Sequence, residues 1–269
     1  MKRLTIITVC YNSINCIEKC IKSILPQLNE SIEYLIIDGK SNDGTLDIIE
    51  KYSKQNKNII YISEKDSGIY NAMNKGLNMA NGEWIIYINS DDCLVPNVVE
   101  RVLPYLVDDY DCIYGDTYNV LSYEENKYLK KVEAYQDLKK LDRQMIACHQ
   151  SIFIKKSVMQ QVGGFNEKYK IAADWDLLLK IRNNNFKFKY VPIVISEFSM
   201  GGISSNTNYI HETHSIRKSN KCYKLLDIYS VLEFIHGLHI KMKLYKILYG
   251  KKAFDKWLKN NDYEKLGEK

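Results

Sequence analysis

The sequence predicts an α/β protein with a mostly parallel central sheet that is flanked by helices. Two observations predict this fold class. Four short runs of apolar, largely β-branched residues lie within the first ninety positions, and a segment with apolar residues at helical spacing separates each run from the next. Buried strands that alternate with helices specify a parallel sheet with right-handed crossovers. A chain of 269 residues can bury one such core and carry a C-terminal helical appendage.

The four strands are expected at residues 4–9, 34–37, 59–62 and 84–88. Each is a continuous apolar run, as is typical of strands that are covered on both faces. Beyond them the pattern predicts a helix after Pro96. It then predicts strands at 112–114 and 151–154, a helix at 174–181 and an extended segment at 188–198. The pattern at 120–135 is meander-like and does not fix an order of strands.

Residues at the starts of the first three helices indicate how each begins. Asn15 with Glu18 three residues later fits a capping box. Thr45 is expected to cap the second helix, and Gly68 opens the third.

Bulk composition favours a globular protein of a reducing compartment. Hydrophobic content is 45% and charged content 26%, and no apolar run approaches the roughly 20 residues of a membrane-spanning helix. The N-terminal residues do not resemble a signal peptide. Seven scattered cysteines predict neither a zinc site nor a disulfide framework, so the cytoplasm is the expected location.

Positive charge is concentrated in the C-terminal part of the chain. The formal net charge is +5, and lysines are frequent from Arg217 onward. Residues 223–249 read as basic and amphipathic, which leaves two interpretations open. In the first interpretation, this region packs on the α/β domain or forms a dimer contact. In the second, it docks on the anionic cytoplasmic face of the inner membrane. A nucleic-acid partner is not predicted, because the basic residues lie outside the sheet edge and form no recognised module.

Three polar segments follow predicted strands at the point where each strand ends. They are residues 8–12, 38–45 and 89–92. Each alone reads as a turn. Because ligands bind beyond the carboxyl ends of strands in open α/β sheets, the three together indicate a nucleotide site. In the third segment, Asp91 and Asp92 place two carboxylates beside a buried strand, where a divalent cation and phosphate could meet.

Seven motifs follow one another along the chain. They are Thr-Val-Cys-Tyr-Asn at 8–12, Ile-Asp-Gly-Lys-Ser-Asn-Asp-Gly-Thr at 37–45, Ser-Glu-Lys-Asp-Ser-Gly-Ile-Tyr-Asn-Ala-Met-Asn-Lys-Gly at 63–76, Asn-Gly-Glu-Trp at 81–84, Asn-Ser-Asp-Asp at 89–92, Cys-His-Gln-Ser at 148–151 and Ala-Ala-Asp-Trp-Asp-Leu-Leu-Leu at 172–179. In this order they resemble the motifs of the family 2 glycosyltransferases.

The resemblance covers roughly residues 3–204 and implies a GT-A, Rossmann-like fold. It implies a catalytic domain at 1–204, with a nucleotide-sugar half at about 1–115 and an acceptor half at about 116–204. A basic amphipathic helical region would follow at 205–269.

The resemblance assigns donor-binding roles to residues of the first half. Thr8 and Tyr11 would border the base and ribose, with the Tyr11 ring offered for stacking. Asp38 would contact the uracil or ribose, and Asp66 and Asn74 would line the sugar-nucleotide pocket. Many family members carry a second Asp after the first, where this chain has Gly39.

It also assigns the metal and the base. Asp91 would approach the ribose or the metal, and Asp92 would hold the Mg²⁺ or Mn²⁺ that bridges the donor diphosphate. Asp174 would remove the acceptor proton, with Asp176 as the alternative. On a helix these two side chains point about 200° apart, so only one can face the donor. His149 would lie on the acceptor or diphosphate side.

The function implied is an inverting, metal-dependent glycosyltransferase that uses a nucleotide-sugar donor, expected to be UDP-linked. The acceptor would be a glycan or a polyprenyl-diphosphate-linked saccharide in bacterial surface polysaccharide (O-antigen or capsule) biosynthesis. One alternative is a sugar nucleotidyltransferase, but the loop at 10–13 lacks the Gly and Arg that would hold a triphosphate. The other is a non-catalytic scaffold that binds a nucleotide or carbohydrate.

Overall fold

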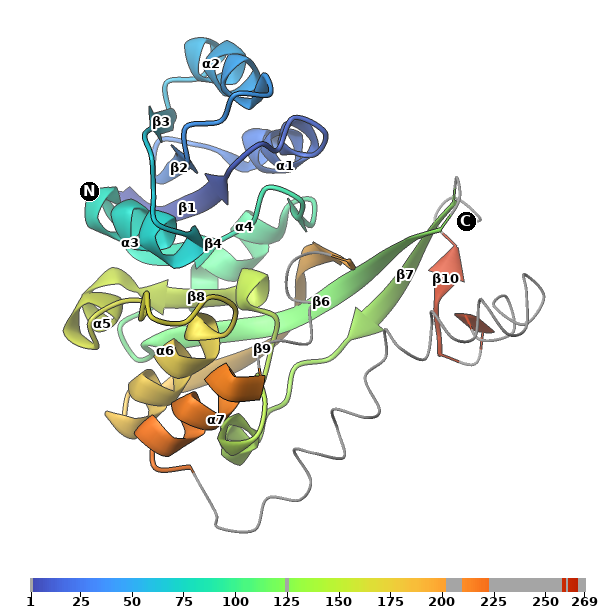
Figure 1. The fold of residues 1–269 in the computed structure, drawn as a ribbon. Helices are drawn as coiled ribbons and strands as arrows, with labels where there is room; N and C mark the ends of the chain where they lie inside the picture. The colour runs from blue at the N-terminus through green and yellow to red at the C-terminus, as the bar shows by residue number, and fades with distance from the viewer. Residues whose placement is uncertain (1, 124–125, 202–209, 223–257, 260, 266–269) are drawn as a thin grey trace.

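The computed structural model describes residues 2–123, 126–201, 210–222, 258–259 and 261–265. It confirms the α/β prediction, with a mixed central sheet between two layers of helices (Figure 1). Four neighbouring strands run parallel in the order β3-β2-β1-β4. Their bounds are β1 (Lys2–Cys10), β2 (Ile32–Asp38), β3 (Ile59–Ser63) and β4 (Gly82–Tyr87).

The second half of the sheet is mixed. Strand β8 is antiparallel to both β4 and β6, whereas β9 runs parallel to β6 and also pairs with the short β5. The bounds are β5 (Cys93–Leu94), β6 (Cys112–Tyr123), β8 (Ile152–Lys155) and β9 (Phe188–Ser199). Strand β6 is thus much longer than the predicted strand at 112–114.

The outer part of β6 forms a hairpin with β7 (Asn126–Val132), which extends away from the body of the molecule (Figure 1). The described strand β10 (Glu264–Lys265) pairs with β7. Most side chains of β7 are exposed or half-buried. Without a buried face the strand carries no strong hydrophobic alternation, and this is why the sequence pattern at 120–135 did not order it.

Each face of the sheet has its own apolar core. Alternate residues of β1 separate cleanly, because Leu4 and Ile6 point to one face and Ile7 and Val9 to the other. The first face is covered by α1 (Ile17–Ile24), α2 (Thr45–Gln55) and α4 (Val98–Val102). The second is covered by α3 (Ile69–Met79), α5 (Lys156–Gln161), α6 (Ala173–Asn183) and α7 (Ile210–Ser219).

Two predicted helix starts are wrong in detail. Helix α1 begins at Ile17 after Cys16, without a side-chain cap, and the Glu18 carboxylate instead accepts a hydrogen bond from the Tyr52 hydroxyl at 2.7 Å. Helix α2 starts one residue earlier than expected, so that Thr45 is its first residue and Gly44 takes the cap position. Gly68 does precede α3, as predicted.

The C-terminal region is described only in part. Helix α7 packs into the same core as α3 and α6, and its Ile216 is fully buried. In the ranges that the structure describes, no helix is long and apolar enough to cross a membrane. The predicted basic amphipathic stretch at 223–249 lies outside the described residues, and the division at 204/205 stays a prediction.

A buried glutamate joins the start of three parallel strands. Glu33 in β2 is 2% exposed, and it accepts a hydrogen bond from the Thr5 hydroxyl at 2.8 Å. It also accepts hydrogen bonds from the backbone and side-chain amides of Asn81 at 2.9 and 2.8 Å. The Thr5 hydroxyl in turn accepts from the amide of Gly82. This network fixes the register at the edge of the sheet opposite to the polar loops.

We therefore expect Glu33→Ala to lower the free energy of unfolding by about 2–4 kcal/mol, because it leaves the buried Thr5 hydroxyl and the partly buried amides of Asn81 without this acceptor. Urea denaturation measures the change. The exposed Glu83 is the control, and Glu83→Ala should change stability by less than about 0.5 kcal/mol. Equal effects of the two substitutions would contradict this account.

Candidate active site

The loops after β1 and β2 are joined into one platform. Three consecutive backbone amides of the first loop donate to side chains of the second, and Asn12 adopts a left-handed conformation with φ of 50°. The donors are the amides of Asn12, Ser13 and Ile14, and the acceptors are Ser41 at 2.8 Å, Thr45 at 2.8 Å and Asp43 at 3.0 Å. The platform is therefore formed before any ligand arrives.

Asp38 connects this platform to the end of the sheet. It is fully buried at the end of β2, and its carboxylate accepts hydrogen bonds from the Ser41 amide at 3.0 Å and from the hydroxyls of Ser41 at 2.5 Å and Ser63 at 2.6 Å. These bonds engage both carboxylate oxygens. The geometry thus gives Asp38 an organising role in the loop, whereas its predicted contact with uracil or ribose stays untested.

Thr8 does not present its side chain to the sheet edge. It shares a strand face with Leu4 and Ile6, lies fully buried, and accepts a hydrogen bond from the Tyr34 hydroxyl at 3.0 Å. The expected contact between the Thr8 side chain and a nucleotide is not supported by this position, because alternate residues of a strand face opposite sides of the sheet.

Tyr11 and Asp66 meet over Gly39. The Tyr11 side chain is 63% exposed, which makes it the most exposed large hydrophobic residue described. A Cβ atom built on Gly39 would lie 2.7 Å from Asp66 Oδ2 and 3.3 Å from Tyr11 Cδ2. A side chain at position 39 would therefore displace the Asp66 carboxylate, which is held through its other oxygen by the Gly68 amide at 3.0 Å. The absence of a second Asp at 39 leaves room for the carboxylate of Asp66.

Asp91 and Asp92 differ sharply in their surroundings. Asp92 is 1% exposed, and its carboxylate accepts hydrogen bonds from the Ser199 amide at 2.7 Å and from Gln150 Nε2. Burial and the adjoining Asp91 charge raise the pKa of Asp92 to about 8, against the opposing effect of those hydrogen bonds. The half-buried Asp91 carboxylate makes no hydrogen bond or ion pair with the described residues. Asp91 is thus the accessible member of the pair.

The donor set suits a cation that is shared with a ligand. The described residues contain no group of three or more His, Cys, Asp or Glu side chains that could hold a metal by themselves. Neither Asp91 nor Asp92 forms an ion pair with a Lys or Arg among the described residues, and Mg²⁺ binds in this way, through one or two carboxylates together with phosphate oxygens. The residues present therefore fit a divalent ion only in company with a diphosphate.

Two partners of the acidic pair were not predicted from the sequence. Gln150 reaches Asp92 across 58 positions, and Ser199 binds both acids, with its amide on Asp92 and its hydroxyl on the Asp91 carbonyl at 2.6 Å. Gln150 lies in the motif at 148–151, but no local pattern shows where its amide points. Ser199 ends an extended segment and carries no signal of its own.

His149 and Asp174 form a pair at the start of α6. His149 lies in the 3₁₀ turn His149–Ser151, and Asp174 is the second residue of α6. His149 Nδ1 is 3.6 Å from Asp174 Oδ2, while Asp174 Oδ1 accepts from the Trp175 amide. The pair borders an apolar pocket whose walls include Tyr87 and Leu177. His149 Nε2 is buried and has no hydrogen-bond partner within the described ranges.

The apolar surroundings set the protonation of both groups. Burial lowers the pKa of His149, so its ring is neutral at neutral pH. Burial also raises the pKa of Asp174, although the neighbouring His149 acts in the opposite direction. A carboxylate whose pKa is raised in this way is a stronger proton acceptor than a solvated one.

Asp176 and Asn74 are engaged elsewhere. Asp176 is buried on the other side of α6, where it pairs with Lys180 at 2.8 Å and accepts from Asn220 at 2.8 Å. Asn74 exchanges hydrogen bonds with the backbone of Phe165 at 2.9 Å and donates to Glu167 at 2.8 Å. Neither side chain has a free group directed at the candidate site, which does not support Asp176 as the base or Asn74 as part of the pocket wall.

The fold is an α/β sheet with helices on both faces, and its polar loops gather at the carboxyl ends of the parallel strands. Residues 5–201 match the family model described as glycosyl transferase family 2, so the chain belongs to this family. It is 30% identical over 193 residues to a PGL/p-HBAD biosynthesis glycosyltransferase of Mycobacterium bovis, covering 70% of this chain and 73% of that one. It is 31% identical over 185 residues to a chondroitin synthase of Pasteurella multocida, covering 67% of this chain but 19% of that one.

Solved structures confirm the GT-A fold. Residues 1–349 of Staphylococcus aureus TarS, in complex with UDP-GlcNAc, superpose with a TM-score of 0.64 at 17% identity, covering 96% of this chain and 79% of that one. The mannosyltransferase PcManGT of Pyrobaculum calidifontis, in complex with GDP-Man and Mn²⁺, gives a TM-score of 0.62 at 16% identity, covering 94% of this chain and 72% of that one.

The raised pKa of Asp92 leads to a pH-dependent stability. Asp92 binds its proton more tightly in the folded state than in the unfolded chain. Its contribution to the free energy of unfolding is therefore fully present below the unfolded pKa of about 4. It is lost as the pH rises through about 8. We expect Asp92→Asn, which cannot ionise, to gain a few degrees in melting temperature over the unmodified protein between pH 5 and pH 8.5 in EDTA. A difference in melting temperature that stays constant with pH would contradict the assignment.

Proposed function

We propose that this protein is an inverting glycosyltransferase that moves a sugar from a UDP-linked donor to a glycan or lipid-linked saccharide. One observation carries the proposal. The accessible Asp91 carboxylate, backed by buried Asp92, lies at the end of β4 on the sheet edge that also carries the Tyr11 platform, and the 148–151 turn links this acidic pair to Asp174. This arrangement supports a nucleotide end at Tyr11, a diphosphate end at Asp91 and a base at Asp174, in that order along the site.

The nucleotide end is assigned to Tyr11 and Asp66. An exposed aromatic ring offers a stacking surface for a base. The Asp66 carboxylate beside Gly39 is an acceptor for an N–H group of that base, a role that uracil can meet with its single ring N–H. Support for UDP comes from this geometry and from the UDP-GlcNAc complex of TarS, which shares the fold.

The diphosphate end is assigned to Asp91 and Asp92 with a divalent cation, Mg²⁺ or Mn²⁺. Asp91 supplies accessible carboxylate oxygens. Asp92, whose pKa is raised to about 8 without a cation, would ionise behind them when the cation binds. When bound, the cation offsets the negative charge that develops on the leaving phosphate oxygen. The Mn²⁺ complex of PcManGT is consistent with this assignment.

Asp174 is assigned as the base. The acceptor hydroxyl loses its proton to Asp174 Oδ2 while its oxygen forms a bond to the anomeric carbon. The bond from that carbon to the diphosphate oxygen breaks on the opposite face, and UDP leaves with the electron pair. A single displacement of this kind inverts the anomeric centre. His149 is 3.6 Å from Asp174 and adjoins Gln150, which binds Asp92, and this position fits the predicted place on the diphosphate or acceptor side.

The acceptor class rests on relatives alone. Relatives named as a PGL/p-HBAD biosynthesis glycosyltransferase and a chondroitin synthase support a role in bacterial surface polysaccharide formation, such as O-antigen or capsule. The proposed location is the cytoplasm, with peripheral attachment to the inner membrane through the basic residues at 223–249. Pelleting with anionic liposomes, reversed by salt, tests that attachment.

The structure disfavours a sugar nucleotidyltransferase. Such an enzyme would need free backbone amides after β1 to hold a triphosphate. Here the amides of Asn12, Ser13 and Ile14 are already bound to side chains of the second loop. A non-catalytic scaffold would retain donor binding but release no UDP.

We expect UDP with Mn²⁺ to raise the melting temperature by about 5 °C or more at saturation, because a ligand that binds only the folded state adds to stability by mass action. A thermal-shift panel of UDP-, GDP- and dTDP-sugars, each with Mn²⁺ and with EDTA, ranks the donor class. Asp91→Asn should abolish the Mn²⁺-dependent part of the shift. No shift with any nucleotide would contradict the donor site.

We also expect Asp174→Asn to lower the rate of UDP release roughly 10²- to 10⁴-fold, the range for loss of a general base. Donor affinity should be unchanged. Asp176→Asn is the matched change two residues along the same helix, and it should keep the rate within about tenfold while lowering the melting temperature. A larger loss of rate in Asp176→Asn than in Asp174→Asn would reverse the assignment.

A further inference from the structure

A carboxylate from helix α7 holds the segment that leads into α6. Glu212 lies in the first turn of α7 and accepts hydrogen bonds from three consecutive backbone amides. They are the amides of Lys170 at 2.7 Å, Ile171 at 3.0 Å and Ala172 at 3.2 Å. Consecutive amides that converge on one anion form a nest, which is a strong and directional arrangement. The family match ends at residue 201, so Glu212 lies outside it.

The same segment is held from the opposite side by α3. The Tyr70 hydroxyl donates to the carbonyl of Ile171 at 2.6 Å. Ala172 is the N-cap residue of α6 and provides no side-chain cap, and Asp174 follows two positions later. The position of Asp174 therefore depends on the hydrogen bonds that other helices make to residues 170–172.

Helix α7 is also fixed at its far end. Asn220 donates to Asp176 Oδ1 at 2.8 Å, and Asn183 Nδ2 donates to the Asn220 carbonyl at 3.2 Å. Between the two ends Ile216 is fully buried in the core. Since both ends and the middle of α7 contact α6 or its core, Glu212 is carried on a rigid support.

We propose that Glu212 is a positioning residue for sugar transfer, which sets Asp174 against the donor by fixing residues 170–172. The inference rests on the proposed function in one respect, namely that Asp174 is the base. It adds that a helix beyond the family match completes the acceptor side of the site. A displacement of about 1 Å in a reacting group can cost about 100-fold in rate.

The donor side should be insensitive to Glu212. Asp38 holds the platform of the first two loops, and Gln150 and Ser199 hold the acidic pair. None of these three residues makes a described hydrogen bond to α7. Loss of Glu212 should therefore lower kcat and leave the affinity for UDP unchanged.

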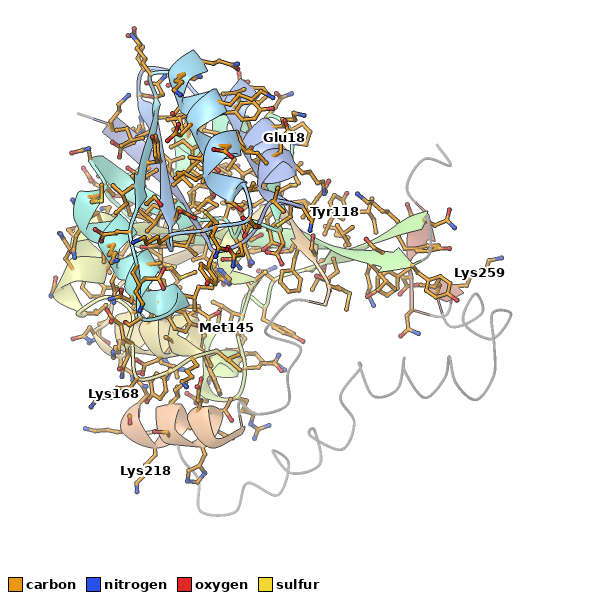
Figure 2. All side chains as sticks on the ribbon, turned by 45° about the horizontal axis from the view of Figure 1, so that its top comes forward. Glu18, Tyr118, Met145, Lys168, Lys218 and Lys259 are labelled. Atoms are coloured by element: carbon orange, nitrogen blue, oxygen red, sulfur yellow. The ribbon has the colours of Figure 1, made fainter. Side chains whose placement is uncertain are left out.

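The test compares Glu212→Ala, which removes all three acceptors, with Glu212→Gln, which keeps the shape and one carbonyl oxygen. Lys218→Ala is the control, because Lys218 is exposed and projects from α7 away from the body (Figure 2). For each protein we would measure the melting temperature, UDP binding with Mn²⁺, the rate of UDP release from the UDP-sugar that gives the largest thermal shift, and hydrogen exchange of amides 170–172.

We expect Glu212→Ala to lower the rate of UDP release about 10- to 100-fold at saturating donor, with the Kd for UDP within about twofold. Amides 170–172 should exchange at least about tenfold faster. Glu212→Gln should have a rate of UDP release and an amide exchange between those of Glu212→Ala and the unmodified protein. If Glu212→Ala does not fold, the Glu212→Gln variant decides whether Glu212 positions Asp174.

A normal rate in a variant whose amides 170–172 exchange faster would overturn the inference, as would unchanged exchange. So would an equal loss of UDP affinity, since that indicates general damage. Unmodified protein that neither binds nor releases UDP would count against the proposed function instead, and the exchange of amides 170–172 would still show whether Glu212 holds this segment.

Discussion

The buried Asp92 carboxylate is the interaction on which the site depends. Its hydrogen bonds to Gln150 and to the Ser199 amide join the end of β4 to the 148–151 turn and to the end of β9. A buried carboxylate without such partners would be costly, so these segments are held together as long as Asp92 is satisfied. Burial and the adjoining Asp91 charge raise the pKa of Asp92 in spite of these hydrogen bonds, and a nearby cation would lower it.

The same 3₁₀ turn links the two halves of the site. Gln150 binds Asp92 on the side proposed for the donor, while the adjacent His149 lies beside Asp174 on the side proposed for the acceptor. Helix α6 is then set by Tyr70 from α3 and by Glu212 from α7. Donor and acceptor groups are thus related through buried polar contacts between secondary-structure elements, which suits chemistry that needs a fixed separation.

The sequence predicted the parts of this fold that have a strong hydrophobic period. Strands β1, β2 and β4 were found because they are buried on both faces, and β3, although mostly half-buried, forms a continuous apolar run. Strand β7 was missed because none of its residues is buried. The strand ends were predictable, and they place the loops of Tyr11, Asp66 and Asp91 at one edge, where their roles stay predictions. Thr8 is buried in its strand, so its predicted contact with a nucleotide gains no support from its position. Gln150, Ser199 and Glu212 depend on pairings over 40 to 107 positions, which no local pattern encodes.

The central claim is that a metal-bound nucleotide diphosphate lies against Asp91 and Asp92, with its base on Tyr11. A crystal structure with UDP and Mn²⁺, in which the anomalous signal of manganese locates the ion, tests this claim most directly. We predict a manganese peak within coordination distance of Asp91 or Asp92 and of both phosphates, with uracil against the Tyr11 ring beside Asp66. Manganese and UDP bound away from this edge, or UDP bound there without contact to either carboxylate, would contradict the account.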